Sequence, residues 1–255
     1  MKIGTDSVLL GSWVTHANPL RILDIGAGTG ILALMLAQKF PQASIEAVEL
    51  DPSSCQQALE NFERSPWRDR LRTHCIDFTL FDRSLTHCYD LIVSNPPYFR
   101  APNRHKGHNR QHPGQQRALA RFQEHLPFSA LIDGVHRLLK PCGLFALILP
   151  NPEADEFEAI SARYAWHLCR ELQVRPSHAK PTHRRLMAWS PIPSSEVQRE
   201  SLAIRQDEGI YTRDYYELTR DFLLWHKEIP PIELEKQHEK NHYSDQRPTA
   251  SSFFS

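Results

Sequence analysis

A short apolar strand, a glycine-rich turn and a buried helix follow one another directly near the start of this chain. The apolar run Arg21–Ile25 predicts a strand, Gly26–Gly30 reads Gly-Ala-Gly-Thr-Gly, and Ile31–Ala37 predicts a helix buried on every face. Glycine adopts positive φ and lets the backbone approach a ligand without a Cβ in the way. In this context the turn indicates a nucleotide cradle, although the Gly-x-Gly-x-Gly spacing displaces the third glycine of the dinucleotide fingerprint and argues against a dehydrogenase.

Acids stand at the ends of the next two predicted strands. Ser44–Glu49 ends in a carboxylate about twenty residues beyond the glycine turn, where an acid accepts bonds from ribose hydroxyls. The strand near Leu71–Ile76 is followed by Asp77, which is placed to accept a bond from an adenine amino group. Asp77 also fits an ordinary loop acid, and Asp24 of the first strand also fits a cap of the helix that follows it.

The fourth predicted strand, Tyr89–Ser94, ends abruptly because Pro96 and Pro97 lack an N–H and have a fixed φ. Asn95, the Pro96 carbonyl and Tyr98 therefore follow one another at the carboxyl end of a strand, where open α/β sheets bind ligands. Such a set suits a planar substrate that carries an NH₂ group. The amide and the carbonyl accept its two N–H bonds, and the aromatic ring stacks on its plane. The alternative is a strand-terminating turn with a core tyrosine.

These residues together resemble the class I S-adenosylmethionine-dependent methyltransferases that methylate amino groups. The resemblance rests, in chain order, on Asp24–Gly30, Glu49, Asp77 and Asn95–Tyr98. Further segments are similar to the bacterial tRNA₁(Val) adenine-N6 methyltransferases, over almost everything from residue 1 to about residue 225. These segments are Lys2–Trp13, Asn61 with Ser65–Trp67, Tyr211–Thr212 and Leu218–Phe222.

The resemblance implies S-adenosylmethionine as the cofactor and N6 of an adenine in tRNA, adenine 37 of tRNA₁(Val), as the acceptor. The catalytic residues are then Asn95, Pro96, Pro97 and Tyr98. The cofactor-binding residues are Thr5, Asp6, Asp24, Gly26, Gly28, Gly30, Glu49, Asp77 and Asn95, of which the first two rest on the resemblance alone. Members of the family carry an additional segment before the Lys-x-Gly-Thr-Asp stretch, so the N-terminal segment here is expected to be short.

Three alternatives remain open at this point. The Asn-Pro-Pro-Tyr motif suits equally the primary amide of a glutamine in a peptide release factor, but that branch usually carries a separate helical domain, for which there is no room before residue 20. Methylation of DNA or ribosomal RNA is also compatible with the motif. The third alternative is a non-catalytic RNA-binding protein that retains the fold, which the intact glycine turn, Glu49, Asn95 and Tyr98 disfavour.

The segment after the motif is basic. Between residues 99 and 123 there is no acid, whereas six basic residues occur: Arg100, Arg104, Lys106, Arg110, Arg117 and Arg121. Basic residues beside a pocket supply the salt-dependent share of RNA affinity, so this segment is predicted to contact tRNA phosphates. The alternative is a solvated loop. The histidines among them have no carboxylate or cysteine nearby, so no metal site is predicted.

The composition of the chain bears on where an RNA site could lie and on the cellular location of the protein. Lysine plus arginine and aspartate plus glutamate number 30 each, so an RNA site must be local rather than a property of the whole surface. No apolar run has the length of a membrane helix, and no signal sequence follows the first methionine. The five cysteines form no C-x-x-C pair, which indicates a reducing, cytoplasmic location without structural zinc.

The rest of the chain predicts an α/β fold with a Rossmann-like, doubly wound and mainly parallel sheet, because apolar strands alternate with helices. The predicted helices are Pro52–Arg64, Phe128–Leu139, which Lys140–Gly143 closes as a stop signal, and Glu153–Tyr164. The predicted strands are 144–149, 166–174 and 184–189, and a strand at 202–205 with a helix starting near Thr212 forms a C-terminal extension. Residues 1–228 are expected to form one methyltransferase domain, and residues 229–255 a disordered tail.

Overall fold

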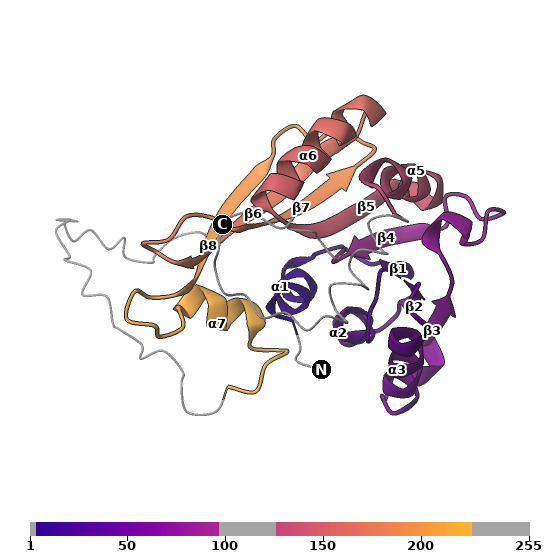
Figure 1. Cartoon of the computed structure of the whole chain (residues 1–255), viewed down its shortest axis with the longest axis horizontal. Helices are drawn as coiled ribbons and strands as arrows, with labels where there is room; N and C mark the ends of the chain where they lie inside the picture. The colour runs from indigo at the N-terminus through magenta and orange to yellow at the C-terminus, as the bar shows by residue number, and fades with distance from the viewer. Residues whose placement is uncertain (1–3, 97–125, 226–255) are drawn as a thin grey trace, which may run out of the picture.

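The computed structural model describes residues 4–96 and 126–225 of the 255-residue chain. It shows one central, twisted sheet with helices on both faces (Figure 1). Pro97, Tyr98, the six basic residues that follow them and the predicted tail lie outside the described residues.

Within the described residues, eight strands form a single sheet in the order β3-β2-β1-β4-β5-β7-β6-β8. Their bounds are β1 (Arg21–Ile25), β2 (Ser44–Glu49), β3 (Leu71–Cys75), β4 (Tyr89–Ser94), β5 (Leu139–Pro150), β6 (His167–Ser177), β7 (Arg184–Ser190) and β8 (Gln198–Arg205). Strands β1 to β5 are parallel, β7 runs antiparallel to both of its neighbours, and β8 is parallel to β6. The predicted fold class is therefore confirmed, and the direction of winding reverses between β1 and β4.

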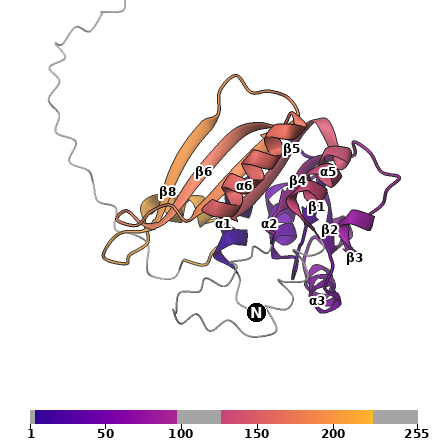
Figure 2. The same cartoon turned by 45° about the horizontal axis from the view of Figure 1, so that its top comes forward.

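The helices cover the sheet in two layers. Their bounds are α1 (Thr5–Trp13), α2 (Ile31–Lys39), α3 (Pro52–Glu63), α5 (Phe128–Leu138), α6 (Asn151–Ser161) and α7 (Arg213–Thr219), with short 3₁₀ turns at η1 (Arg68–Arg70), η2 (Phe78–Leu80) and η3 (Ala162–Tyr164). One buried cluster joins α1, α2, α3 and α7 to the sheet, and a second joins α5 and α6 to its other face (Figures 1 and 2). In the part of the chain described, no helix is both long enough and apolar enough to cross a bilayer.

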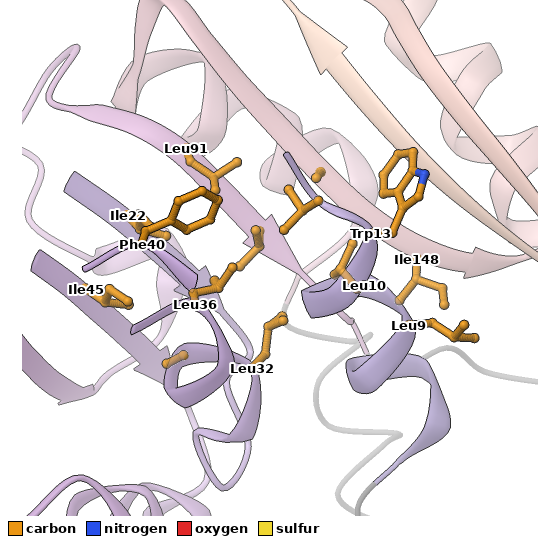
Figure 3. Packing of buried hydrophobic residues seen from close by; sticks show 14 of the residues in the cluster. Leu9, Leu10, Trp13, Ile22, Leu32, Leu36, Phe40, Ile45, Leu91 and Ile148 are labelled. Carbon is orange, nitrogen blue, oxygen red and sulfur yellow. The ribbon is translucent and has the colours of Figure 1, made fainter. Parts of the chain in front are cut away.

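Helix α1 was not predicted from the sequence, because local signals for it are weak. Its N-cap, Gly4, makes no side-chain bond, and Gly11 disfavours a helix interior. The helix forms because Leu9, Leu10 and Trp13 are buried between α2 and the sheet (Figure 3), each fully buried leucine contributing about 1.5–3 kcal/mol. A Cβ on Gly11 would lie 2.7 Å from the Met35 side chain, so this glycine permits close packing of α1 on α2.

Helix α5 ends at Leu138, just before the predicted stop signal at Lys140–Gly143, as the sequence indicated. The strand predicted at 144–149 begins earlier than expected, because β5 starts at Leu139 and runs through this segment. The register against β4 shifts there, from Tyr89 opposite Leu139 to Leu91 opposite Leu144. The irregularity accommodates the extra residues, including Pro141, which is exposed and need not donate to a neighbouring strand.

The C-terminal extension packs on the same sheet. Strand β8 pairs with β6 from Gln198 onward, so it is longer than predicted because pairing with a neighbour continues into a polar sequence. Thr212 caps α7: its hydroxyl accepts a bond from the Tyr215 amide at 3.2 Å and donates one to the Ala203 carbonyl at 2.6 Å. The latter bond ties the helix to β8.

We predict that Arg70→Met destabilises the protein by about 1–3 kcal/mol, because a half-buried charged donor is lost from three carbonyls. The guanidinium donates to the carbonyl oxygens of Ala37, Phe40 and Ala43, which closes the end of α2 and the turn into β2. Urea unfolding measures the change. Arg68→Met is the control, since that side chain is 69% exposed, and equal stabilities of the two variants would contradict the assignment.

Candidate functional site

The predicted motifs meet at one edge of the sheet because of strand register. Ile25, the last residue of β1, lies opposite Val48 of β2 and Ser94 of β4. The glycine turn, Glu49 and Asn95 therefore start at the same level on adjacent strands, which are spaced about 4.8 Å apart. This edge is the carboxyl edge at the point where the winding reverses, the usual ligand position in open α/β sheets.

The glycine turn lies at this edge of the sheet and is bonded to β2. Gly26, Gly28 and Gly30 all have positive φ, at 71°, 56° and 76°. The amides of Gly26 and Ala27 donate to the Val48 carbonyl, which ties the turn to β2. A Cβ on Gly28 would meet nothing within 4 Å, whereas a Cβ on Gly30 would lie 2.5 Å from the Phe62 ring. Gly28 therefore faces open space, and Gly30 allows α2 to pack against α3.

Glu49 links the turn to the start of α3. One carboxylate oxygen accepts a bond from the Gly28 amide at 2.7 Å, and the other accepts one from the Asp51 amide at 2.9 Å. The residue is 8% exposed. Each carboxylate oxygen has two acceptor sites, so Glu49 retains capacity for ribose hydroxyls while it holds the backbone.

Asp24 lies in β1, two residues before the glycine turn, and is 1% exposed. Burial, with the neighbouring Glu49 carboxylate as a second cause, raises the pKa of Asp24 to about 7, while a bond from the Ala33 amide of α2 opposes the shift. The capping and cofactor-binding roles of Asp24 both stay predictions. Its Oδ2 atom has no hydrogen-bond partner among the residues described, and an unpartnered buried acceptor of this kind is suited to a cationic ligand group.

Asp77 lies two residues beyond Cys75, the last residue of β3, which is paired with Glu49 of β2. Its Oδ1 atom caps η2 by accepting bonds from the amide and the hydroxyl of Thr79, at 2.8 and 2.7 Å. The residue also lines a small, mostly apolar hollow beside the glycine turn. The lining residues are Gly26, Val48, Leu50, Ile76, Asp77, Phe78 and Leu126.

Asn95 is oriented from two sides. The hydroxyl of Ser94, the preceding residue, donates to the Ile25 carbonyl at 2.9 Å and fastens the end of β4 to the end of β1. The amide nitrogen of Asn95 donates to the hydroxyl oxygen of Ser7 in α1, also at 2.9 Å. Pro96, the next residue in the chain, is buried.

The structure places the predicted residues of α1 differently from one another. Thr5 is exposed, whereas Asp6 accepts a bond from Arg184 of β7 at 3.0 Å, both side chains being 19% exposed. Their roles in cofactor binding stay predictions.

Sequence reasoning missed two polar contacts in the site. The first is Ser7, whose only signal was that it belongs to Lys2–Trp13, a segment on which the family resemblance rests. The second is Asn61, which donates to the Thr29 carbonyl at 2.9 Å and so holds the glycine turn from α3. Asn61 belongs to a segment on which the family resemblance rests, and that was its only signal. Among the described residues, no group of three or more histidines, cysteines, aspartates or glutamates could hold a metal ion.

Comparisons with known proteins agree with this geometry. Residues 2–112 match the Methyltransferase small domain family. Proteins called tRNA₁(Val) (adenine(37)-N6)-methyltransferase in Yersinia pestis and Yersinia pseudotuberculosis are 39% identical to this chain over 225 residues, which is 88% of this chain and 86–88% of theirs. The chain belongs to the tRNA₁(Val) (adenine(37)-N6)-methyltransferase family. The family predicted from the sequence is therefore confirmed.

Solved structures show the same fold for this family member. A crystal structure of a predicted O-methyltransferase from Agrobacterium tumefaciens superposes with a TM-score of 0.65 at 17% identity, over 87% of this chain and 98% of that one. A TehB-like SAM-dependent methyltransferase from Corynebacterium glutamicum gives a TM-score of 0.50 at 16% identity, over 73% and 88%. At these identities the comparison establishes the methyltransferase fold alone.

We predict that the stability of this family member depends on the titration of Asp24. Because the pKa is raised in the folded state, the folded protein keeps a proton between about pH 4 and pH 7 that the unfolded chain has lost. The free energy of unfolding should therefore fall as pH rises through this window, by at most roughly 1.4 kcal/mol per pH unit, and level off above it.

Urea unfolding of the wild type and of Asp24→Asn at several pH values measures this effect. The variant should lack this component of the pH dependence, so the difference between the two curves should change mainly below pH 7. Asp69→Asn is the control, because that side chain is 92% exposed. Parallel curves for the wild type and Asp24→Asn would contradict the assignment.

Proposed function

We propose that this chain transfers a methyl group from S-adenosylmethionine to N6 of adenine 37 in tRNA₁(Val). The observation that carries the proposal is the register that sets Asn95 beside the glycine turn, at the edge where the sheet reverses its winding. The names of the relatives, which share the family across 88% of this chain, specify the acceptor.

The site's residues fit the cofactor part by part. The open space over Gly28 and the unpartnered Asp24 oxygen suit the methionine portion with its ammonium group, and Glu49 suits the ribose. The hollow at Asp77, lined mostly by apolar side chains, suits the adenine ring. When bound, S-adenosylmethionine supplies a methyl group on a sulfonium that is its own leaving group.

The acceptor side needs positioning more than a strong base. The N6 lone pair of adenine is delocalised into the ring, so the amino group is a poor nucleophile. The Asn95 carbonyl and the Pro96 carbonyl would accept its two N–H bonds, favour a pyramidal nitrogen and direct the lone pair at the methyl group. Tyr98 would stack on the base, which must be unstacked in an RNA loop or flipped out of it.

The partner and setting follow from the same proposal. The six basic residues between Arg100 and Arg121 would contact tRNA phosphates next to the acceptor motif. A tRNA-modifying enzyme acts where tRNA is present, so the location is the cytoplasm.

Asn95→Ala is expected to lower turnover by roughly 10² or more while cofactor affinity stays nearly unchanged, because the carbonyl matters most when the nitrogen becomes pyramidal and positive. Single-turnover assays on tRNA₁(Val), with the product nucleoside identified by mass, measure this. Asn18→Ala is the control, an exposed asparagine that precedes β1 at the opposite edge of the sheet.

The products also separate the alternatives. Full activity in Asn95→Ala would remove this residue from the reaction. Methyl groups that appear on protein glutamine, or on ribosomal RNA or DNA instead of tRNA, would contradict the adenine-37 assignment.

A further inference from the structure

We propose that Ser7 of α1 is a positioning residue that orients the Asn95 amide toward the acceptor amino group. The inference rests on the proposed function, in which the carbonyl end of that amide is the part that acts. It assigns a role in the reaction to a residue of α1 that lies 88 positions before Asn95 in the sequence.

The geometry supports this role through the two unlike ends of an amide. The nitrogen end of Asn95 is bound by the Ser7 hydroxyl oxygen at 2.9 Å. Within residues 4–96 and 126–225, no hydrogen bond reaches the oxygen end. An amide has donors at one end and an acceptor at the other, so occupation of the nitrogen by α1 leaves the acceptor for a ligand.

The need for such a contact follows from side-chain torsions. The terminal torsion of asparagine is broad and roughly two-fold, so the amide rotates and flips at little cost when nothing holds it. A flipped Asn95 would direct its own N–H groups at the N–H groups of the acceptor. The bond to Ser7 restricts the amide plane before the acceptor arrives, which removes part of the ordering cost from the chemical step.

Helix α1 is rigidly placed for this task. Asp6, the residue before Ser7, forms the ion pair with Arg184 at the start of β7, and both side chains are largely shielded from solvent. On the other side, Leu9 and Leu10 are fully buried against α2 and the sheet (Figure 3). A side chain on an element held from two sides positions its partner more closely than one on a loop.

The test uses three serine variants of the full chain in single-turnover methylation of tRNA₁(Val) at saturating S-adenosylmethionine. Ser7→Ala should lower the rate about tenfold with unchanged cofactor affinity and unchanged melting temperature, because only the acceptor geometry is affected. Ser7→Thr keeps the hydroxyl and should restore most of the rate. Ser12→Ala is the matched control: Ser12 lies in the same helix, and its hydroxyl has no partner among the described residues.

A double-variant cycle separates orientation from general support of the fold. A carboxylate has two equivalent oxygens and cannot be flipped into a wrong orientation. In the Asn95→Asp background, Ser7→Ala should therefore change the residual rate less than twofold. A tenfold further loss there, or a rate for Ser7→Ala alone within twofold of the wild type, would overturn the proposal.

A measurement that needs no acceptor distinguishes failure of this inference from failure of the proposed function. The ¹⁵N resonance of the Asn95 side-chain amide is assigned by its loss in Asn95→Asp. Ser7→Ala should shift it and speed its hydrogen exchange, whereas Ser12→Ala should leave it in place. An unchanged resonance in Ser7→Ala would overturn the inference, while a wild-type enzyme inactive on tRNA would overturn only the proposed acceptor.

Discussion

The Glu49 carboxylate, which accepts bonds from the amides of Gly28 and Asp51, is the interaction on which the candidate site depends. It joins the turn after β1 to the start of α3 through the end of β2. Without these bonds the turn, in which three of the five residues are glycines, would have high conformational entropy. In the proposed function the same carboxylate also binds the ribose, so the group that orders the turn is also a group that would bind the cofactor. Preorganisation of this kind lowers the cost of binding.

The groups proposed for the cofactor and the group proposed for the acceptor follow different strands of the sheet. Strands β1, β2 and β3 end in the groups that suit the cofactor, and β4 ends in the group that suits the acceptor. The bond from Ser94 to the Ile25 carbonyl fastens the two halves where they meet. Helix α1 reaches across this junction, since Ser7 contacts Asn95 and Asp6 contacts Arg184 of β7. Strand β7 therefore helps to place the helix that, in our proposal, orients the acceptor motif.

The features that could be predicted from the sequence are those that depend on a few neighbouring residues. Glycine turns, strand-terminating prolines and acids at strand ends have meaning within a few residues, so the fold class and the edge that carries the site were predictable. Contacts between distant segments were not: nothing near Ser7 indicates that Asn95 lies beside it. The early start of β5 at Leu139 was missed for the same reason, because pairing with β4 extends the strand beyond the apolar run at 144–149.

The central claim is that one carboxylate both orders the glycine turn and contributes to cofactor binding. Calorimetric titration of S-adenosylhomocysteine into Glu49→Gln tests it most directly, with the exposed Glu63→Gln as the control. The two backbone amides bond different oxygens of Glu49, and glutamine replaces one of these oxygens by an NH₂ donor, so one of the two bonds is lost. We predict at least a tenfold loss of affinity in Glu49→Gln and none in Glu63→Gln. Equal affinities for Glu49→Gln and the wild type would contradict the account.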